Sequence, residues 1–186
     1  MSKLETNTID TVSGTTNLVI GSTNSSTVTF ENGAVTGHMY PAFFAYLSAD
    51  QTGIADNVVT KVQLNATTID TDSGFDTTTN YRYTIPSGKG GKYFISAQAM
   101  MVNASVSTMA FAQSQLYKNG TRIGRGTVDF RNNYGIRCSP NVNAILDLSV
   151  GDYLELHVQV DRTSGSTSVV TYDNGETYLT GFRIGA

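Results

Sequence analysis

The chain has 186 residues, a formal net charge of −3 and 15% charged residues, whereas charged residues make up about a quarter of a typical domain. A general nucleic-acid-binding domain would be strongly basic, so this class is excluded. No run of about 18 apolar residues occurs, which excludes insertion into a membrane as a spanning helix. The 18 glycines and 3 prolines, with frequent Thr, Ser and Asn, favour many short strands joined by turns.

Residues 1–37 differ in character from the rest of the chain. Residues 17–21 and 27–33 are short apolar-polar alternations, and Phe30 is the one aromatic residue. A segment with so little apolar surface cannot bury a core of its own. It is therefore either a flexible tether or a stalk in which three copies wrap around one axis. The axis would be lined by Leu18, Ile20, Val28, Phe30 and Val35.

Residues 38–41 are expected to be a junction, because the pattern beyond them is that of strands. Residues 42–48 are strongly apolar and predict a first strand. Residues 58–67 predict a second strand, and 75–84 predict the approach to a hairpin. In the second strand one face would carry Val58, Thr60, Val62 and Leu64.

A tight reversal is predicted at residues 86–91, which contain one proline and three glycines. Residues 91–97 then alternate large side chains with small or polar ones, the pattern of a strand with one face in a core. Strand pattern continues over residues 93–115, around Pro140 and over residues 153–160. Eight to ten strands separated by turns, with no helical period, predict a β-sandwich.

Four segments carry a family resemblance. The first runs Leu64, Asp70, Phe75, Tyr83, Gly91, Tyr93 and Ile95. The others are residues 116–120 with an Asn-Gly turn, 148–156 with a Gly-Asp turn before a strand, and 177–184, the closing strand. In this order they resemble the signature of the C1q/TNF-like family over residues 41–186. The spacers to Tyr83 and Gly91 depart from the family spacing, and Ile95 stands where Phe is usual.

The resemblance implies an all-β fold, a C1q/TNF-like jelly-roll sandwich, and a trimeric assembly. It also implies that aromatic residues of the first strand, the strand after the Gly-Asp turn and the last strand meet around the threefold axis. The candidates are Tyr40, Phe43, Phe44, Tyr46, Tyr153 and Phe182. Some of these side chains must instead fill the core of the single domain.

We therefore expect an extended stalk or attachment segment over residues 1–37 and a jelly-roll head over residues 38–186. A trimeric head would bring three stalks together at high effective concentration, which favours the shared axis over the flexible tether. The alternation in the stalk resembles the short β-structured stems of phage fibres.

A candidate ligand-binding region lies in the middle of the chain, where five of the twelve basic residues fall in one window. Guanidinium groups bind carboxylate and phosphate in a forked geometry, and aromatic side chains offer stacking faces. The window therefore predicts a site for acidic polysaccharide or phosphate; the alternative is a solvated rim. Its residues are Lys118, Arg122, Arg125, Arg131, Tyr134 and Arg137.

No catalytic residues are predicted. Cys138 and His157 imitate a nucleophile-base pair, but nothing positions a third group, and a lone cysteine is usually a small buried hydrophobe. Asp70, Asp72 and Asp76 are weak candidates for calcium ligands, because the EF-hand pattern fails around them. We expect no bound metal or other cofactor, and calcium is the one ion that the sequence leaves open.

These features lead to the hypothesis of a trimeric, non-enzymatic virion fibre or spike whose head binds a host cell-surface receptor or glycan. Its N-terminus would attach to another virion protein. One alternative is a capsid decoration fibre of the same fold. Another is a non-viral C1q-like trimeric module in signalling or matrix. With one cysteine and no apolar secretory signal, synthesis in the host cytoplasm and a place on the tail or capsid surface are expected; the alternative is extracellular.

Overall fold

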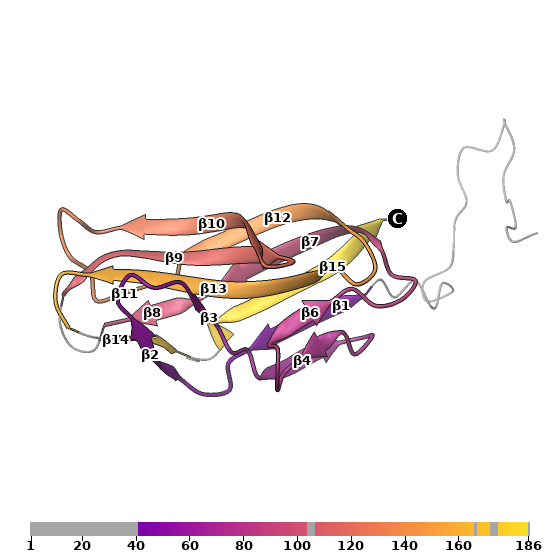
Figure 1. Ribbon diagram of the computed structural model, residues 1–186, viewed down its shortest axis with the longest axis horizontal. Helices are drawn as coiled ribbons and strands as arrows, with labels where there is room; N and C mark the ends of the chain where they lie inside the picture. Colours follow the sequence, from indigo (N-terminus) through magenta and orange to yellow (C-terminus); the bar gives the residue numbers. More distant parts are fainter. Residues whose placement is uncertain (1–40, 104–106, 166, 172–174, 186) are drawn as a thin grey trace, which may run out of the picture. The chain divides into compact units, whose positions relative to one another are not determined.

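The computed structural model describes residues 41–103, 107–165, 167–171 and 175–185, all within one compact unit, Met39–Ala186. The described residues form strands and turns without an α-helix (Figure 1). The all-β prediction is therefore confirmed. The predicted stalk, with its axis residues Leu18, Ile20, Val28, Phe30 and Val35, lies outside the described residues, as does Tyr40. The division at residues 37 and 38 stays a prediction.

The first of the two main sheets has five antiparallel strands, and its second strand is the alternating segment after the glycine-rich turn. The order is β12 (Asn141–Leu148), β7 (Gly91–Gln98), β15 (Tyr178–Gly185), β1 (Ala42–Tyr46) and β4 (Ala66–Asp70). The last strand of the head therefore lies beside the first one. The Arg183 N–H donates to the Pro41 carbonyl at 3.0 Å, which places the two ends of the head together.

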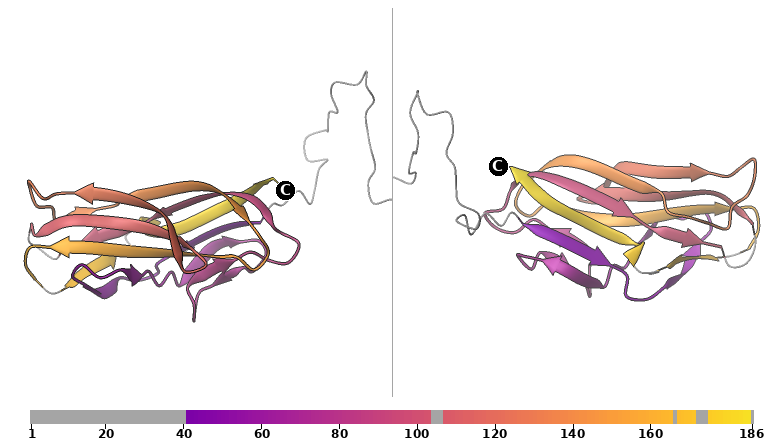
Figure 2. Two further views of the ribbon diagram at one scale, coloured as in Figure 1. Left: turned by 45° about the horizontal axis from the view of Figure 1, so that its top comes forward. Right: turned by 180° about the vertical axis from the view of Figure 1, so that it is seen from behind.

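The second main sheet covers one face of the first (Figures 1 and 2). Its order is β10 (Thr121–Asp129), β9 (Met109–Lys118), β13 (Tyr153–Arg162), β6 (Arg82–Thr84) and β5 (Phe75–Asp76), with β3 (Thr60–Lys61) beside β13. Two antiparallel sheets packed face to face bury alternate side chains of every strand. The resulting core holds Tyr83, Tyr93, Ile95, Leu116 and Leu154, each 1% exposed or less.

A short third sheet continues the first. Its order is β11 (Arg137–Cys138), β8 (Met100–Val102), β14 (Thr167–Thr171) and β2 (Gln51–Ala55). These strands adjoin β12, β7, β15 and β1 in the sequence and keep the same neighbours. Two buried hydroxyls bridge the break between the sheets: Ser114 Oγ accepts from the Ala99 N–H, and Thr177 Oγ1 accepts from the Met100 N–H, both at 3.0 Å.

The large residues of the first segment of the family resemblance are buried: Leu64, Phe75, Tyr83, Tyr93 and Ile95. Tyr83 stacks on Phe43 with ring centroids 3.8 Å apart, and burial raises the pKa of the Tyr83 hydroxyl well above its ordinary value. Asp70 closes the turn before β5, because its carboxylate accepts from the N–H groups of Gly74 (2.9 Å) and Phe75 (3.0 Å). The spacing between Asp70 and Phe75 is thus that of a side-chain-capped turn.

The predicted second strand is not continuous. The segment 58–67 is regular only at β3 and at the first two residues of β4, and Val58 is 51% exposed while Val62 and Leu64 are buried. Here the chain passes from the second sheet to the first: the Val62 N–H donates to Leu156 in β13, and the Asn65 N–H donates to Tyr46 in β1. A single strand cannot bridge two sheets, so the predicted common face of Val58, Thr60, Val62 and Leu64 is wrong.

The segment 75–84 is the predicted approach to the hairpin. It contains β5 and β6, joined by a turn that Asp76 organises. Its carboxylate accepts from the N–H groups of Thr78, Thr79 and Asn80 at 2.9–3.1 Å, and these hydrogen bonds hold the pKa of Asp76 well below its ordinary value. An aspartate that caps three successive N–H groups ends the strand.

At one edge of the sandwich, glycines allow a strand of each main sheet to approach the other closely. β10 runs along β12 of the opposite sheet (Figure 1), and the two strands approach closely at Gly124 and Gly126. A Cβ on Gly126 would overlap the Asn141 carbonyl oxygen and lie 2.8 Å from the carbonyl carbon. A Cβ on Gly124 would lie 3.0 Å from a methyl group of Val142. The edge therefore depends on the absence of side chains.

We predict that Gly126→Ala lowers the free energy of unfolding by about 1–3 kcal/mol, because the added methyl group forces β10 away from β12. Urea unfolding followed by circular dichroism measures the change. Gly185→Ala in β15 is the matched control, since a Cβ there meets nothing within 4 Å. Equal midpoints for the two variants would contradict a close approach at this edge.

Candidate functional site

The outer face of the first sheet carries apolar side chains that the core does not use. In β1, β7 and β15 the even-numbered residues point away from the core, and in β12 the odd-numbered residues do. Ile145 is 68% exposed, Phe182 47% and Ile69 49%. We call this surface the outer apolar face; its residues are Phe44, Tyr46, Ile69, Phe94, Ile145, Tyr178, Phe182 and Ile184.

These side chains adjoin one another across the strands. Phe94 is in register with Phe182 on one side and with Ile145 on the other. The Phe94 and Phe182 rings lie 5.6 Å apart, and Phe44 stacks on Tyr178 at 5.4 Å. Cross-strand pairs of this kind form a continuous surface. Contiguous exposed apolar surface on a soluble domain marks an interaction site.

Of the six predicted interface aromatics, Phe44, Tyr46 and Phe182 lie on the outer apolar face. Phe43 is 1% exposed inside its own domain, as it must be, because neighbouring residues of a strand point to opposite faces. Tyr153 lies in β13 of the other sheet, where the Arg82 guanidinium carbon is 4.1 Å from its ring centroid. Tyr40 lies outside the described residues.

Sequence reasoning did not name the other five residues of this face, which are Ile69, Phe94, Ile145, Tyr178 and Ile184. A signal was present in β12, where Val142, Ala144 and Leu146 form one parity and face the core. Ile145 stands on the other parity, between asparagine and aspartate. A large aliphatic side chain on the polar parity of a strand is the feature that could have located this surface.

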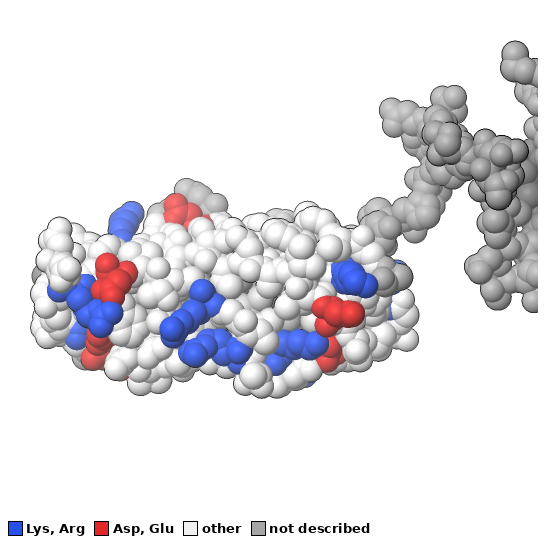
Figure 3. All heavy atoms as spheres, turned by 90° about the horizontal axis from the view of Figure 1, so that it is seen from above, with Lys and Arg blue, Asp and Glu red and all other residues white. Residues whose placement is uncertain are grey.

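The basic residues of the predicted ligand-binding window do not form one cluster. Figure 3 shows Lys and Arg in a broken row, with acidic side chains toward both ends. Lys118 Nζ lies 2.8 Å from Asp152 Oδ2, and hydrogen bonds from Lys118 and Asn119 lower the pKa of Asp152 to about 2. Arg131 is paired with Asp129.

The other members of the window stand apart from these two ion pairs. Arg122 and Arg125 are exposed on β10, and Arg137 is exposed on β11. Within the described part of the chain these three form no ion pair. Tyr134, 43% exposed, lies in the β10–β11 loop. The structure thus distributes the window over β9, β10, the β10–β11 loop and β11.

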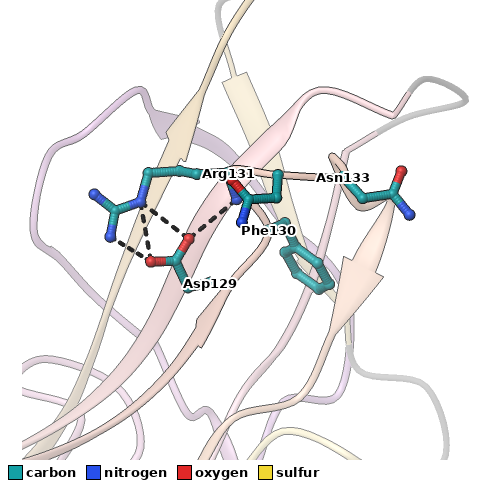
Figure 4. A pocket seen from close by; sticks show the side chains of 5 residues that line it. Asp129, Phe130, Arg131 and Asn133 are labelled. Carbon is teal, nitrogen blue, oxygen red and sulfur yellow. Dashed lines mark hydrogen bonds and ion pairs between the residues drawn. The ribbon is translucent and has the colours of Figure 1, made fainter.

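A hollow of about 610 Å³ lies on that loop (Figure 4). Its lining is a single run of five residues: Asp129, Phe130, Arg131, Asn132 and Asn133. A volume between about 300 and 1,000 Å³ is usual for small-molecule sites. Among the lining side chains, Asp129 and Arg131 are hydrogen-bonded to each other, and Phe130 packs against the core.

The three predicted calcium candidates all take part in local contacts. Asp70 and Asp76 cap turns, and Asp72 accepts from the Thr71 hydroxyl at 2.8 Å and pairs with Lys89 at 3.2 Å. The Thr71 hydrogen bond, with the Lys89 ammonium, lowers the pKa of Asp72. Within the described ranges no three His, Cys, Asp or Glu side chains cluster in a way that suits a metal. The expectation of no bound metal, with calcium left open, stays a prediction.

Cys138 and His157 have separate surroundings. The Cys138 thiol lies 3.5 Å from the Met109 sulfur, and burial raises the pKa of the thiol to about 12. His157 packs against the Tyr117 ring at 4.1 Å, with Glu155 Oε2 at 4.0 Å and Lys61 bound to Glu155 at 2.5 Å. Burial lowers the pKa of His157 from 6.5 to about 4. A thiol that stays protonated is a poor nucleophile.

Comparison with known proteins identifies the fold. No protein-family model and no curated protein matches the sequence. Among solved structures, the globular domain of zebrafish complement 1qA is 17% identical, with a TM-score of 0.51 over 77% of this chain and 97% of that one. Murine APRIL at pH 5.0 is 10% identical, with a TM-score of 0.56 over 78% of this chain and 99% of that one. Eiger TNF from S. frugiperda is 10% identical, with a TM-score of 0.53 over 78% of this chain and 92% of that one.

The chain therefore has a C1q/TNF-like jelly-roll fold, as its motifs predicted. At these identities the comparisons establish the fold alone. No helix in the part of the chain that the structure describes is long and apolar enough to cross a membrane.

We predict that stability falls as the pH drops from about 6.5 to about 4, because the unfolded chain takes up a proton on His157 in this window while the folded chain resists it. Urea unfolding at a series of pH values measures the slope. In His157→Gln the fall over this window is smaller, since the titrating group is gone. Parallel curves for the two proteins would show that His157 has no part in it.

Cys138 is predicted to react with iodoacetamide about a thousandfold more slowly in the folded protein at pH 8 than a free thiol does, because its raised pKa removes the thiolate. Mass spectrometry follows the modification. After unfolding in urea the reaction reaches the rate of a free cysteine. Fast labelling of the folded chain would mean that the thiol is accessible and ionised.

Proposed function

We propose that this chain is a non-enzymatic recognition module of the C1q/TNF-like type that self-associates through the outer apolar face of its first sheet, as a homotrimer. The observation that carries the proposal is the exposure of Phe182 and Ile145 beside Phe94 on that face. Three strands present these side chains at adjacent positions, and the charged side chains that a solvated sheet face usually carries are sparse there.

The physical argument rests on the cost of apolar surface in water. Each exposed large side chain that becomes buried contributes up to about 1.5–3 kcal/mol. A second copy that covers Ile69, Ile145, Phe182 and Ile184 gains that contribution several times over. Aromatic residues dominate the energetics of such interfaces because they bury much area with few rotatable bonds. In a cyclic trimer, which the family resemblance implies, a neighbouring subunit covers the outer apolar face of every subunit.

Self-association of the module would also determine how strongly it binds a ligand. Three copies of one weak ligand site, held at fixed positions, bind a surface that repeats its ligand with far greater avidity than one copy does. A polar surface such as the β10–β11 loop is suited to this role, because it carries exposed side chains that assembly through the outer apolar face leaves uncovered.

A signalling or matrix module outside the cell is the context that the structural neighbours support best. A virion fibre or spike head, or a capsid decoration fibre, is the second candidate. The observation that favours this candidate is residues 1–37, whose short apolar-polar alternations lack the Gly-x-y repeat of a collagen stalk. In this case the N-terminal segment attaches to the particle, and the head contacts a host receptor or glycan.

We predict that the full chain at micromolar concentration has a solution mass about three times its 19.9 kDa, measured by light scattering after size exclusion. The double variant Ile145→Glu/Phe182→Glu is expected to be monomeric, because two carboxylates per subunit cannot be buried unpaired. Ile123→Glu is the control: Ile123 is 40% exposed but lies on β10 of the other sheet, and this variant stays trimeric.

Circular dichroism checks that each variant keeps its β structure. A monomeric wild-type chain would overturn the proposal. A double variant that remains trimeric would place the interface on another surface.

A further inference from the structure

The β10–β11 loop is held in a fixed shape. The Phe130 N–H donates to the Ala110 carbonyl of β9 at 2.7 Å, and the Asn133 N–H donates to the Phe130 carbonyl at 2.8 Å. Met109 and Gly135 exchange two backbone hydrogen bonds of 3.0 and 3.1 Å. The Phe130 side chain packs against the core, and a Cβ on Gly135 would lie 2.9 Å from its ring. A site whose shape exists before binding loses little entropy when a ligand enters.

The charges of the two ionised side chains in the hollow, Asp129 and Arg131, neutralise each other. Arg131 Nε donates to both carboxylate oxygens of Asp129, at 3.0 and 2.9 Å, and the Arg131 N–H donates to the same carboxylate at 3.0 Å (Figure 4). Hydrogen bonds from Arg131 lower the pKa of Asp129 to about 2, so the pair stays ionised and neutral in sum over the physiological range. An anionic ligand would have to displace Asp129 from Arg131.

The hollow also presents polar groups that the protein does not use. Asn132 and Asn133 are exposed, and their side chains form no hydrogen bond with any other described residue. Each amide offers one acceptor and two donors. Tyr134 follows directly, with its ring 43% exposed. Adaptable amides beside a rigid, amphipathic ring are a combination that recognition loops use for polar ligands.

We infer that the hollow formed by residues 129–133, together with Tyr134, the next residue of the loop, binds a neutral saccharide. Sugar hydroxyls both donate and accept, which matches the free amides and the Asp129–Arg131 pair. The apolar face of a pyranose ring can lie against Tyr134. The assignment names the ligand class of the proposed recognition function and rests on that function. It differs from the acidic polysaccharide of the sequence prediction, because Arg131, the cation that lines the hollow, is already paired with Asp129.

The position of the loop suits this role. The loop lies at one end of the head, whereas the start of β1 and the end of β15 lie at the other end (Figures 1 and 2). No residue of the β10–β11 loop belongs to the outer apolar face. A ligand bound there meets no part of the surface through which copies would associate.

The test is binding of the full chain to a printed panel of neutral oligosaccharides, ending in mannose, galactose, glucose or N-acetylglucosamine, together with their sialylated and sulfated counterparts. The wild-type protein is expected to bind at least one neutral member. Asn132→Ala/Asn133→Ala is expected to weaken that binding at least tenfold, because it removes both free amides. Gln63→Ala, which removes an exposed amide elsewhere, leaves binding unchanged, as does Arg122→Ala/Arg125→Ala.

Three results would overturn the inference: no binding to any neutral member, neutral binding that the Asn132/Asn133 variant retains, or binding to acidic members alone that Arg122→Ala/Arg125→Ala abolishes. Light scattering on the same samples separates this inference from the proposed function. A trimer that binds no neutral glycan contradicts only the saccharide site. A monomer contradicts the proposed assembly, whatever the panel shows.

Discussion

The strict alternation of side chains along the first sheet is the constraint on which the rest of the structure depends. The same strands that supply Tyr93, Ile95 and Leu179 to the core supply Phe94, Tyr178 and Phe182 to the opposite face. Core and outer face are thus fixed by one register. A slip of one residue in β7 or β15 would exchange the two sets, so the buried tyrosine and aliphatic residues hold the outer aromatic rows in place.

Much of the fold was predictable because the motif residues point inward at fixed spacings. Tyr83, Tyr93 and Ile95 are buried, and burial restricts both the residue type and the distance to the next buried position. The interface aromatics named from the sequence do not all lie on the outer apolar face, since Phe43 and Phe44 adjoin in one strand and cannot share a face. Sequence spacing locates strands well, but it does not say which parity a sheet turns toward another sheet.

The pairing of the basic residues in the predicted ligand-binding window could not be read from the sequence, for an electrostatic reason. A window of five cations suggests an anion site, but the sequence does not show which of them are paired. Asp152 is far from Lys118 in the sequence, and the two meet only through the pairing of β9 with β13. Asp129 and Arg131 are two residues apart, yet a sequence pattern does not distinguish a local ion pair from two independent charges. The hollow itself depends on how Phe130 anchors the loop, which is a tertiary contact.

The hydrogen bond between Arg183 and Pro41 has a consequence for the engineering of such heads. A domain whose entry and exit points touch can be inserted whole into an exposed loop of another protein without stretching its host. The same closeness permits circular permutation: a short linker would join residues 41 and 185, and new ends could open at the exposed turn around Gly88. The jelly-roll head could therefore be moved into another protein as a unit, and its β10–β11 loop would stay at the end remote from the point of insertion.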